Sequence, residues 1–346
     1  MYTLSTLQHK AIRNNISLKP FNTFQLDVKA RYWTEIHQPD DLLRVMETSV
    51  FQREPRFILG GGSNVLFSQD FPGLVIRNSI PGISRISGNE RHVVLRAGAG
   101  VVWDDLVRDT LTKGWAGLEN LSMIPGQTGA APIQNIGAYG VELESVFLTL
   151  DAIDLKTGET VQFDRQMCRF GYRDSIFKSS HKDHYLITHV TLKLNKFPEL
   201  NLEYGNLKEV LEDDGIGHPD IMDVSRAVRK IRSSKLADPA VTGNDGSFFK
   251  NPVVSEEKFE KLKEIHPEIP SYPAGHQIKI PAAWLIDKCG FKGKRIGDAG
   301  VHDRHALILV NHGNATGMDL IRLAKMIQQE VQQHFGVALE PEVNIV

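Results

Sequence analysis

Two glycine-rich segments constrain the fold of this chain more than any other feature. The first glycine segment is LGGGSNVLF at 59–67, and the second glycine segment is IPGQTGAAPIQNIGAYG at 124–140. Because glycine has no Cβ, the backbone there can approach a ligand closely, and successive N–H groups can line a concave anion site. Each charge-assisted hydrogen bond of this kind is worth roughly 1.5–3 kcal/mol. Single glycine clusters are more often plain turns. Two long ones together predict a site for a ligand with an extended phosphate bridge.

Neither segment is a standard nucleotide-binding loop. The chain has no GxGxxG that opens a helix, since GAGVVW at 98–103 lacks the third glycine, and it has no GxxxxGK[ST]. The Ser, Asn, Gln and Thr side chains of the two segments favour a dinucleotide held without a Rossmann fold, and flavin adenine dinucleotide (FAD) fits that description. The predicted FAD-binding residues are Gly60, Gly61, Gly62, Ser63, Asn64, Val65, Leu66, Ile124, Pro125, Gly126, Thr128, Gly129, Ala130, Gln134, Asn135, Gly137, Ala138, Tyr139 and Gly140.

Length and composition indicate an ordinary protein of more than one domain. A chain of 346 residues predicts two or three compact units. Its net charge of −2 gives no general attraction for nucleic acid, so we expect a small-molecule partner and no nucleic-acid partner. Cys168 and Cys289 form neither a CxxC pair nor a zinc set, and we interpret them as reduced packing residues.

No targeting, membrane or metal-binding pattern is found. Residues 1–21 have no uninterrupted apolar core of the kind a secretory signal needs, and no run of about eighteen apolar residues occurs. We therefore expect a cytoplasmic protein without a membrane anchor. His302 and His305 are spaced for one helix face, but no carboxylate or cysteine completes a ligand set, so no metal is predicted.

Hydrophobic periodicity predicts an α+β chain in which the first half alternates helix and strand. Gly114 and Gly336 are expected to end two of the helices. The predicted helices are 40–50, a segment from 103 to Gly114, 223–232, 282–290 and a long helix that ends at Gly336. The predicted strands are 57–59, 74–78, 92–100, a hairpin over 147–163, then 185–194, 306–311 and 337–346.

The segment GNDGSFFKNP at 243–252 places Ser247 between a glycine turn and two bulky rings. Taken alone, GND is a good turn sequence and FF a good start for a buried strand. A hydroxyl at this position then only satisfies a nearby backbone group. For most of the basic side chains of 223–232, a solvated helix face is likewise favoured.

Five motifs in a fixed order give these segments another interpretation. GGGSNVLF, GLENLSMIPGQTGAAPIQNIGAYG, CRFGYRDSIFK, GNDGSFFKNP and LEPEV resemble the UDP-N-acetylenolpyruvoylglucosamine reductase family, from about Leu18 to the end of the chain. LEYGNL at 202–207 resembles the subtype with a substrate-covering tyrosine loop. The resemblance implies a three-part α+β flavoprotein with a non-Rossmann FAD-binding fold of two subdomains and an α/β substrate domain. The expected boundaries are 1–71 with 337–346 for the first FAD-binding subdomain, 72–235 for the second, and 236–336 for the substrate domain.

The resemblance also implies a reaction. NADPH would reduce FAD, and flavin N5 would then pass hydride to the terminal methylene carbon of UDP-N-acetyl-3-O-(1-carboxyvinyl)-glucosamine. The product would be UDP-N-acetylmuramate for peptidoglycan synthesis, and hence for cell-wall biogenesis, cell shape and cell division. Ser247 would protonate the neighbouring carbon, while Arg173 and Glu342 would stabilise its negative charge. Without the motif, Arg173 is a surface ion pair with Asp174, and Glu342 can stabilise that charge only if it is protonated or bridged.

The remaining implied contacts are with the UDP-sugar. The implied substrate-binding residues are Tyr204, Lys235, Asn251, Tyr272, Lys292 and His305. Four residues depart from the family pattern: His305 stands where some relatives have glutamine, Asn344 where arginine is expected, and Gln127-Thr128 vary the second glycine segment. A monomer is expected, although oligomeric state is not determined by the sequence. Two alternatives stay open: an FAD-dependent oxidase of the same wider fold, and a non-catalytic sugar-nucleotide sensor.

Overall fold

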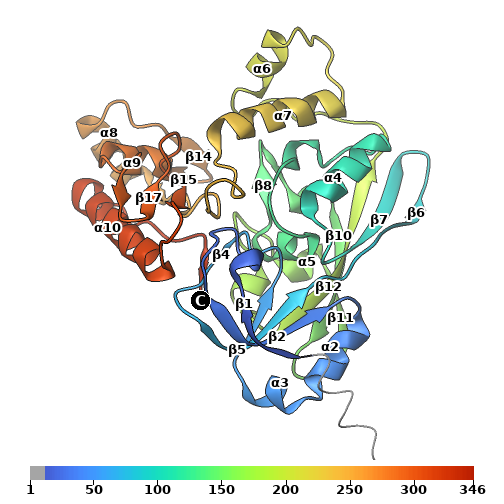
Figure 1. The fold of residues 1–346 in the computed structure, drawn as a ribbon. Coiled ribbons are helices and arrows are strands. Elements are labelled where there is room, and N and C mark those ends of the chain that lie inside the picture. Colours follow the sequence, from blue (N-terminus) through green and yellow to red (C-terminus); the bar gives the residue numbers. More distant parts are fainter. Residues whose placement is uncertain (1–11) are drawn as a thin grey trace, which may run out of the picture. The chain divides into compact units, whose positions relative to one another are not determined.

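The structure, a computed structural model, describes residues 12–346 (Figure 1). The start of the segment inspected for a targeting signal lies outside the described residues. The chain forms two compact units. Among the described residues, unit 1 comprises 12–16, Ala30–Gly61 and Pro72–Ser234, and unit 2 comprises Ser17–Lys29, Gly62–Phe71 and Lys235–Val346. The three-part division inferred from the resemblance stays a prediction.

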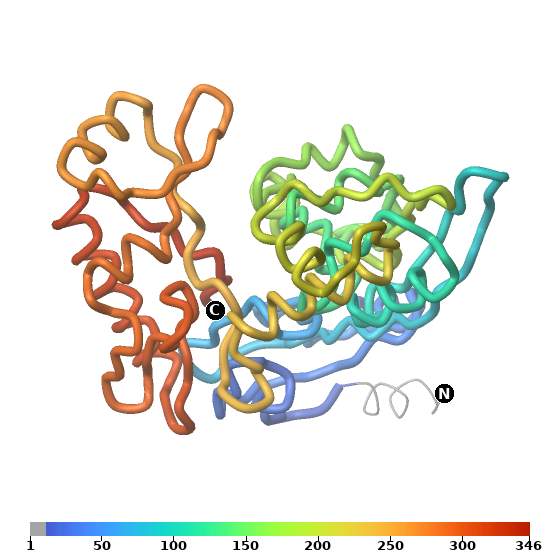
Figure 2. Tube along the Cα trace, turned by 90° about the horizontal axis from the view of Figure 1, so that it is seen from above, coloured from blue at the N-terminus to red at the C-terminus, as the bar shows by residue number. Residues whose placement is uncertain are grey.

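Unit 1 contains two larger sheets. One has the strand order β1-β2-β5-β3, with β3 and β5 parallel. The other has the order β11-β10-β12-β7-β6 and is antiparallel, with the β6–β7 hairpin at its edge (Figures 1 and 2). The strands of unit 1 are β1 (Arg13–Ser17), β2 (Lys29–Ile36), β3 (Arg56–Leu59), β5 (Phe71–Asn78), β6 (Ile83–Gly88), β7 (His92–Gly98), β8 (Gly137–Ala138), β9 (Val141–Glu142), β10 (Phe147–Asp154), β11 (Thr160–Asp164) and β12 (Tyr185–Asn195).

Helices of unit 1 cover and connect these sheets. The α-helices are α2 (Pro39–Met46), α3 (Ser49–Arg53), α4 (Trp103–Thr112), α5 (Arg165–Cys168), α6 (Leu207–Asp213) and α7 (Ile221–Lys235). The short 3₁₀ helices are η2 (Glu119–Leu121), η3 (Thr128–Gln134), η4 (Leu143–Ser145) and η5 (Ile176–Lys178). The α4 face predicted from the sequence is buried against the five-stranded sheet, and Trp103 Nε1 donates to Leu121 O at 3.0 Å.

Unit 2 is built from smaller sheets and one long helix. Its strands are β4 (Val65–Leu66), β13 (Val253–Ser255), β14 (Tyr272–Ala274), β15 (Gln277–Lys279), β16 (Arg295–Ile296), β17 (Ala299–Val301), β18 (Leu309–Asn311) and β19 (Asn344–Ile345). Its helices are η1 (Lys19–Phe21), α8 (Glu256–Ile265), α9 (Ala282–Lys288) and α10 (Gly317–Phe335). The α10 stripe predicted from periodicity is buried, a capping box from Thr316 begins the helix, and Gly336 ends it at φ +61°.

Three predicted elements differ from the structure. The helix expected over 40–50 is two helices, because the Thr48 hydroxyl accepts the Phe51 N–H and begins a second one. The strand expected over 306–311 is only β18, since Leu307 and Ile308 pair with another segment. The strand expected over 337–346 is only β19, because Pro341 has no N–H to donate to a ladder.

Not all basic residues of α7 lie on a solvated face: Arg226 and Lys230 are exposed, whereas Arg229 is mostly buried. Arg229 donates to both carboxylate oxygens of Asp104 on α4, at 2.8 and 2.5 Å, and Figure 1 shows α7 beside α4. Burial raises the pKa of Asp104, but hydrogen bonds from Arg229 and from the Met123 N–H outweigh it and hold the pKa below its usual value. The pair therefore attaches α7 to the rest of unit 1.

Replacing Asp104 by asparagine is expected to destabilise the protein by about 2–3 kcal/mol at neutral pH, because Arg229 keeps its burial and loses its counter-charge. A carboxyl whose folded pKa is depressed stabilises above its unfolded pKa, and that contribution is lost as pH falls through the folded pKa. The difference from wild type should therefore shrink below about pH 4. Urea unfolding at several pH values measures this difference in unfolding free energy. Asp109→Asn on the same helix is the control, since its exposed pair with Lys113 should contribute under about 0.5 kcal/mol.

Candidate active site

Ser247 lies in the segment 243–249 of unit 2, here called the Ser247 segment. Ser247 itself is half-buried and forms an isolated bridge with Ile308, and the Phe248 N–H donates to Leu307 O at 2.8 Å. The following phenylalanine rings are fully buried in edge-to-face contact. Pairing on one side and buried rings on the other set the position of the backbone that carries the hydroxyl.

The segment that carries Glu342 pairs with the Ser247 segment. The Glu342 N–H donates to Phe248 O at 2.8 Å, the Lys250 N–H donates to Glu340 O at 2.9 Å, and Phe249 bridges Pro341. Unit 2 thus brings together two of the three predicted catalytic residues.

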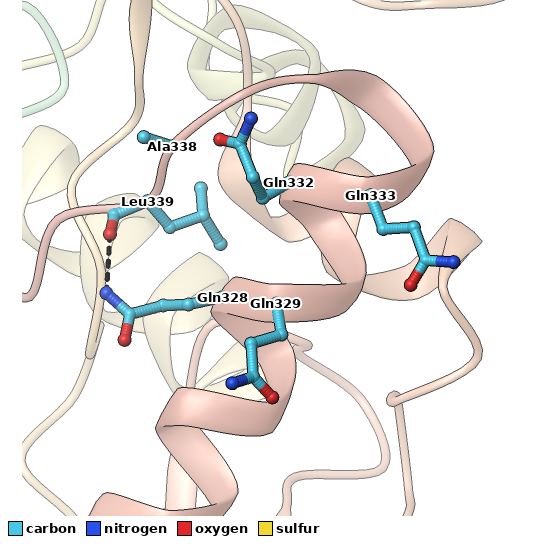
Figure 3. A pocket seen from close by; sticks show the side chains of 6 residues that line it. All are labelled: Gln328, Gln329, Gln332, Gln333, Ala338 and Leu339. Carbon is cyan, nitrogen blue, oxygen red and sulfur yellow. Dashed lines mark hydrogen bonds between the residues drawn. The ribbon is translucent and has the colours of Figure 1, made fainter.

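The carbonyl of Leu339, which precedes this pairing, accepts a hydrogen bond from Gln328 Nε2 of α10 at 2.7 Å (Figure 3). Gln328 lies beside other glutamines of α10 that flank a shallow groove. The helix therefore anchors the chain shortly before Glu342.

The later half of the first glycine segment lies beside the same C-terminal strand. β4 pairs in parallel with β19, so Val65 lies opposite Asn344. The Asn344 N–H donates to Asn64 O at 3.2 Å, and Asn64 Nδ2 donates to Glu342 O at 3.4 Å. Asn344, the departure from the family pattern, therefore has a clear structural contact with this segment.

The glycines of the two segments lie where a side chain would collide with backbone or close neighbours. In unit 1, a Cβ on Gly61 would come within 3.0 Å of Gly126 Cα, so the two segments touch there. A Cβ on Gly60 would lie 3.2 Å from Gln127 Oε1, a buried acceptor with no hydrogen-bond partner among residues 12–346. In unit 2, Gly62 has φ +66°. Close backbone and an unsatisfied buried acceptor suit a ligand with N–H or O–H donors, and FAD has both.

Arg173 lies in unit 1 on a tight loop attached to the second glycine segment. Gly171 and Asp174 exchange two backbone hydrogen bonds of 3.1 Å, and Arg173 between them has φ +54°. Asn135 Nδ2 donates to Gly171 O at 3.2 Å, and Ser175 Oγ donates to Ile133 O at 2.7 Å. A left-handed arginine costs on the order of 1 kcal/mol, and such backbone strain is concentrated at functional sites.

Arg232 is a residue of this site that the sequence interpretation missed. Its guanidinium is largely buried, and the groups that act on it electrostatically include Tyr139, Arg173 and Asp104. Burial lowers the pKa of Arg232, and the positive charge of Arg173 lowers that pKa further. Arg232 Nε has no hydrogen-bond partner within the described chain. The positive charges of Arg173 and Arg232 act on one another and together favour an anion. Only the packing of α7 distinguishes the buried Arg232 from the exposed Arg226 and Lys230 of the same helix.

Tyr204 lies against the second glycine segment in unit 1. The Tyr204 Cβ is 3.2 Å from where a Cβ on Gly140 would be, and Asn201 Nδ2 donates to Gly140 O at 3.2 Å. The Tyr204 side chain is 47% exposed.

The other predicted substrate residues lie in unit 2. Burial lowers the pKa of His305, and the positive charge of Lys235, then of His302 and Lys292, lowers that pKa further, so these groups act on one another electrostatically. Asn251 Oδ1 accepts the N–H of Ala282 at 2.9 Å at the start of α9, which is a structural contact. Tyr272 begins β14 and is half exposed.

Comparison with known proteins defines the class and then the family. Residues 31–164 match the FAD binding domain model, and residues 238–346 match the model of the UDP-N-acetylenolpyruvoylglucosamine reductase, C-terminal domain. The chain is therefore an α+β FAD-dependent oxidoreductase that uses NADPH.

Similar proteins named UDP-N-acetylenolpyruvoylglucosamine reductase span nearly the whole chain. One from Chromobacterium violaceum is 47% identical over 97% of this chain and 98% of its own, and one from Pseudomonas aeruginosa is 48% identical over 96% and 98%. The chain belongs to the UDP-N-acetylenolpyruvoylglucosamine reductase family.

Solved structures agree at the level of fold. The reductase from Thermus caldophilus, at 24% identity, superposes with a TM-score of 0.67 over 96% of this chain and 99% of that one. The 4-ethylphenol oxidase from Gulosibacter chungangensis reaches 0.51 at 10% identity over 97% and 86%. Within residues 12–346, no helix combines the length and apolar character needed to cross a membrane.

Proposed function

We propose that the chain reduces the enol ether of UDP-N-acetyl-3-O-(1-carboxyvinyl)-glucosamine to UDP-N-acetylmuramate, a peptidoglycan precursor, with NADPH as reductant. When bound, FAD supplies the hydride that the methylene carbon of the substrate receives. The pairing of the Ser247 segment with the Glu342 segment is the observation that supports this most, because Ser247 and Glu342 then lie on adjoining backbone.

Ser247 acts as the general acid in this proposal. Addition of hydride to the methylene carbon leaves negative charge on the neighbouring carbon, which spreads into the carboxylate. An alcohol is a weak acid, but an enolate-like carbon is basic enough to take its proton if the hydroxyl is held close and water is excluded. The buried Phe248 and Phe249 rings exclude water from one side of the segment.

Arg173 and Glu342 stabilise the developing charge. The planar guanidinium of Arg173 matches a carboxylate in a bidentate manner. Glu342 acts on the same developing charge from the backbone that pairs with the Ser247 segment. A nearby anion would also relieve the repulsion between Arg173 and Arg232.

The two glycine segments hold the cofactor in this proposal, with Gln127 Oε1 as an acceptor for one of its donors. Lys235 and Lys292 bind the diphosphate of the substrate as cations, with His305, Asn251 and Tyr272 as further contacts, and Tyr204 covers the ligand. The cytoplasmic location, the monomeric state and the lack of a nucleic-acid partner inferred from the sequence remain predictions.

Anaerobic stopped-flow spectroscopy of the flavin tests the proposed reaction in two halves. NADPH should bleach the flavin absorbance, and subsequent addition of the enolpyruvyl substrate should restore it with formation of UDP-N-acetylmuramate. An oxidase of the same fold would be bleached by an alcohol and recoloured by oxygen. A sensor would bind the sugar nucleotide without any change of flavin redox state, and either result would reject the proposal.

A further inference from the structure

Asp245 is a buried carboxyl group that the proposed chemistry does not use. It is 6% exposed and lies two residues before Ser247. Its hydrogen-bond partners are the Thr23 hydroxyl and the Val65 N–H, and neither carries a charge. A carboxyl buried among neutral groups is costly, so its presence calls for a role.

The Asp245 side chain joins three segments of unit 2. Oδ2 accepts the N–H of Val65, in the first glycine segment, at 2.6 Å, and Oδ1 is hydrogen-bonded to Thr23 Oγ1. Thr23 in turn donates to Gly62 O, from its N–H at 2.9 Å and from its hydroxyl at 3.3 Å, and its carbonyl accepts the Asn244 N–H at 2.9 Å. Hydrogen bonds therefore join the Ser247 segment, Thr23 and the first glycine segment to one another in a closed network.

This network reaches both predicted catalytic groups of unit 2. Only Gly246 separates Asp245 from Ser247, and the Gly246 N–H donates to Asn244 Oδ1 at 3.0 Å, which closes the turn. Val65 lies opposite Asn344, two residues after Glu342, in the β4–β19 pair. The Asp245 side chain is therefore close in sequence to Ser247 and bonded to the strand that pairs with the residues after Glu342.

We propose that Asp245 is a positioning residue that holds Ser247 on the first glycine segment, so that its hydroxyl is placed to protonate the substrate carbon. The inference rests on the proposed role of Ser247. Misplacement of a reacting group by about 1 Å can cost about 100-fold in rate, so a single side chain in this network can control the proton-transfer step.

Hydrogen-bonding geometry predicts which substitution preserves the function. Burial raises the pKa of the Asp245 carboxyl well above its usual value, which favours the neutral acid. In the structure Oδ2 accepts from Val65 and Oδ1 accepts from the Thr23 hydroxyl. A neutral carboxyl still accepts from Val65 and can offer its proton to Thr23 Oγ1, which leaves the Thr23 hydroxyl to donate to Gly62 O. Asparagine can make the same bonds, because its carbonyl accepts from Val65 and its amide donates to Thr23. Alanine can make neither.

The test is a double-mutant cycle on the holoenzyme, with the two flavin half-reactions measured separately. Asp245→Ala should slow recolouring by about 10- to 100-fold with little effect on bleaching, whereas Asp245→Asn should stay close to wild type. In the Ser247→Ala background, Asp245→Ala should add almost nothing, because a residue that acts through Ser247 has no further effect once the hydroxyl is gone. Asp27→Ala, an exposed aspartate of the same unit, is the matched control.

Amide hydrogen exchange gives a readout that does not depend on turnover. Protection of the Val65 amide should fall in Asp245→Ala and persist in Asp245→Asn. If Asp245→Ala does not fold, two other variants test the inference. Asp245→Asn should keep a near-normal rate of recolouring, whereas Thr23→Val should slow recolouring and leave bleaching unchanged.

Three results would overturn the inference. The first is that Asp245→Ala slows recolouring equally with and without the Ser247 hydroxyl. The second is that Asp245→Ala slows both half-reactions alike. The third is that Asp245→Asn slows recolouring as much as Asp245→Ala does. Normal recolouring in Ser247→Ala alone would instead reject the role of Ser247, and with it this inference.

Discussion

Replacement of Ser247 by alanine is expected to leave bleaching of the flavin by NADPH nearly unchanged and to slow recolouring by the enolpyruvyl substrate by about 10²–10⁴-fold. The reason is that the first half-reaction needs no proton on the substrate carbon, whereas the second leaves a carbanion that must be quenched. The side chain is half-buried and its neighbours pack through their backbone and rings, so the loss of one oxygen should not disturb the fold.

Stopped-flow absorbance measures both rates on the same preparation. Ser271→Ala, an exposed serine of unit 2, serves as the control and should match wild type in both halves. Equal slowing of the two half-reactions in Ser247→Ala would contradict the assignment, because it would indicate a general disturbance of the flavin site and not the loss of a proton donor.

Gly62→Ala should have the largest effect on stability, at least about 3 kcal/mol, and should reduce the yield of flavin-loaded protein. Gly62 has φ +66°, which costs alanine roughly 1–2 kcal/mol by itself. In addition, a Cβ would lie 1.9 Å from Phe21 O, a backbone atom that cannot turn away as a flexible side chain can. The clash would force apart the start of unit 2 and the first glycine segment.

Gly336→Ala separates the cost of the left-handed backbone from the cost of the clash with Phe21 O. Gly336 has a similar φ of +61°, but nothing lies within 4 Å of its ideal Cβ, so this variant should lose only about 1 kcal/mol. Urea unfolding of both variants gives the free energies, and flavin absorbance gives cofactor content. Equal losses of unfolding free energy in the two variants would show that the clash with Phe21 O adds nothing to the destabilisation by Gly62→Ala.

Elements with strong local signals were predicted well from sequence. The long apolar stripe of α10 with its terminal glycine, the α4 face that ends near Gly114, and the hairpin of β10 and β11 around Gly158 all occur as expected. Each depends on a periodicity or a turn residue within about ten to twenty residues, where side-chain pattern and backbone preference agree.

Elements that depend on distant partners were predicted less well. The segment before Leu309 and the segment around Pro341 have apolar residues suited to strands, yet both pair with the Ser247 segment through isolated bridges. Arg229 and Arg232 have the same residue type and similar neighbours along α7, and only tertiary packing pairs one with Asp104 and buries the other near Arg173.

The sequence by itself determined which chemical groups are available and in what order: two glycine segments, a serine between glycine and phenylalanine, and an arginine and a glutamate in recognisable motifs. The tertiary structure alone decided that Glu342 lies on backbone paired with the Ser247 segment, and that Asp245 is buried between Thr23 and Val65. The physical reason is that burial and long-range hydrogen bonds arise when segments far apart in the chain meet, and no local periodicity records that meeting.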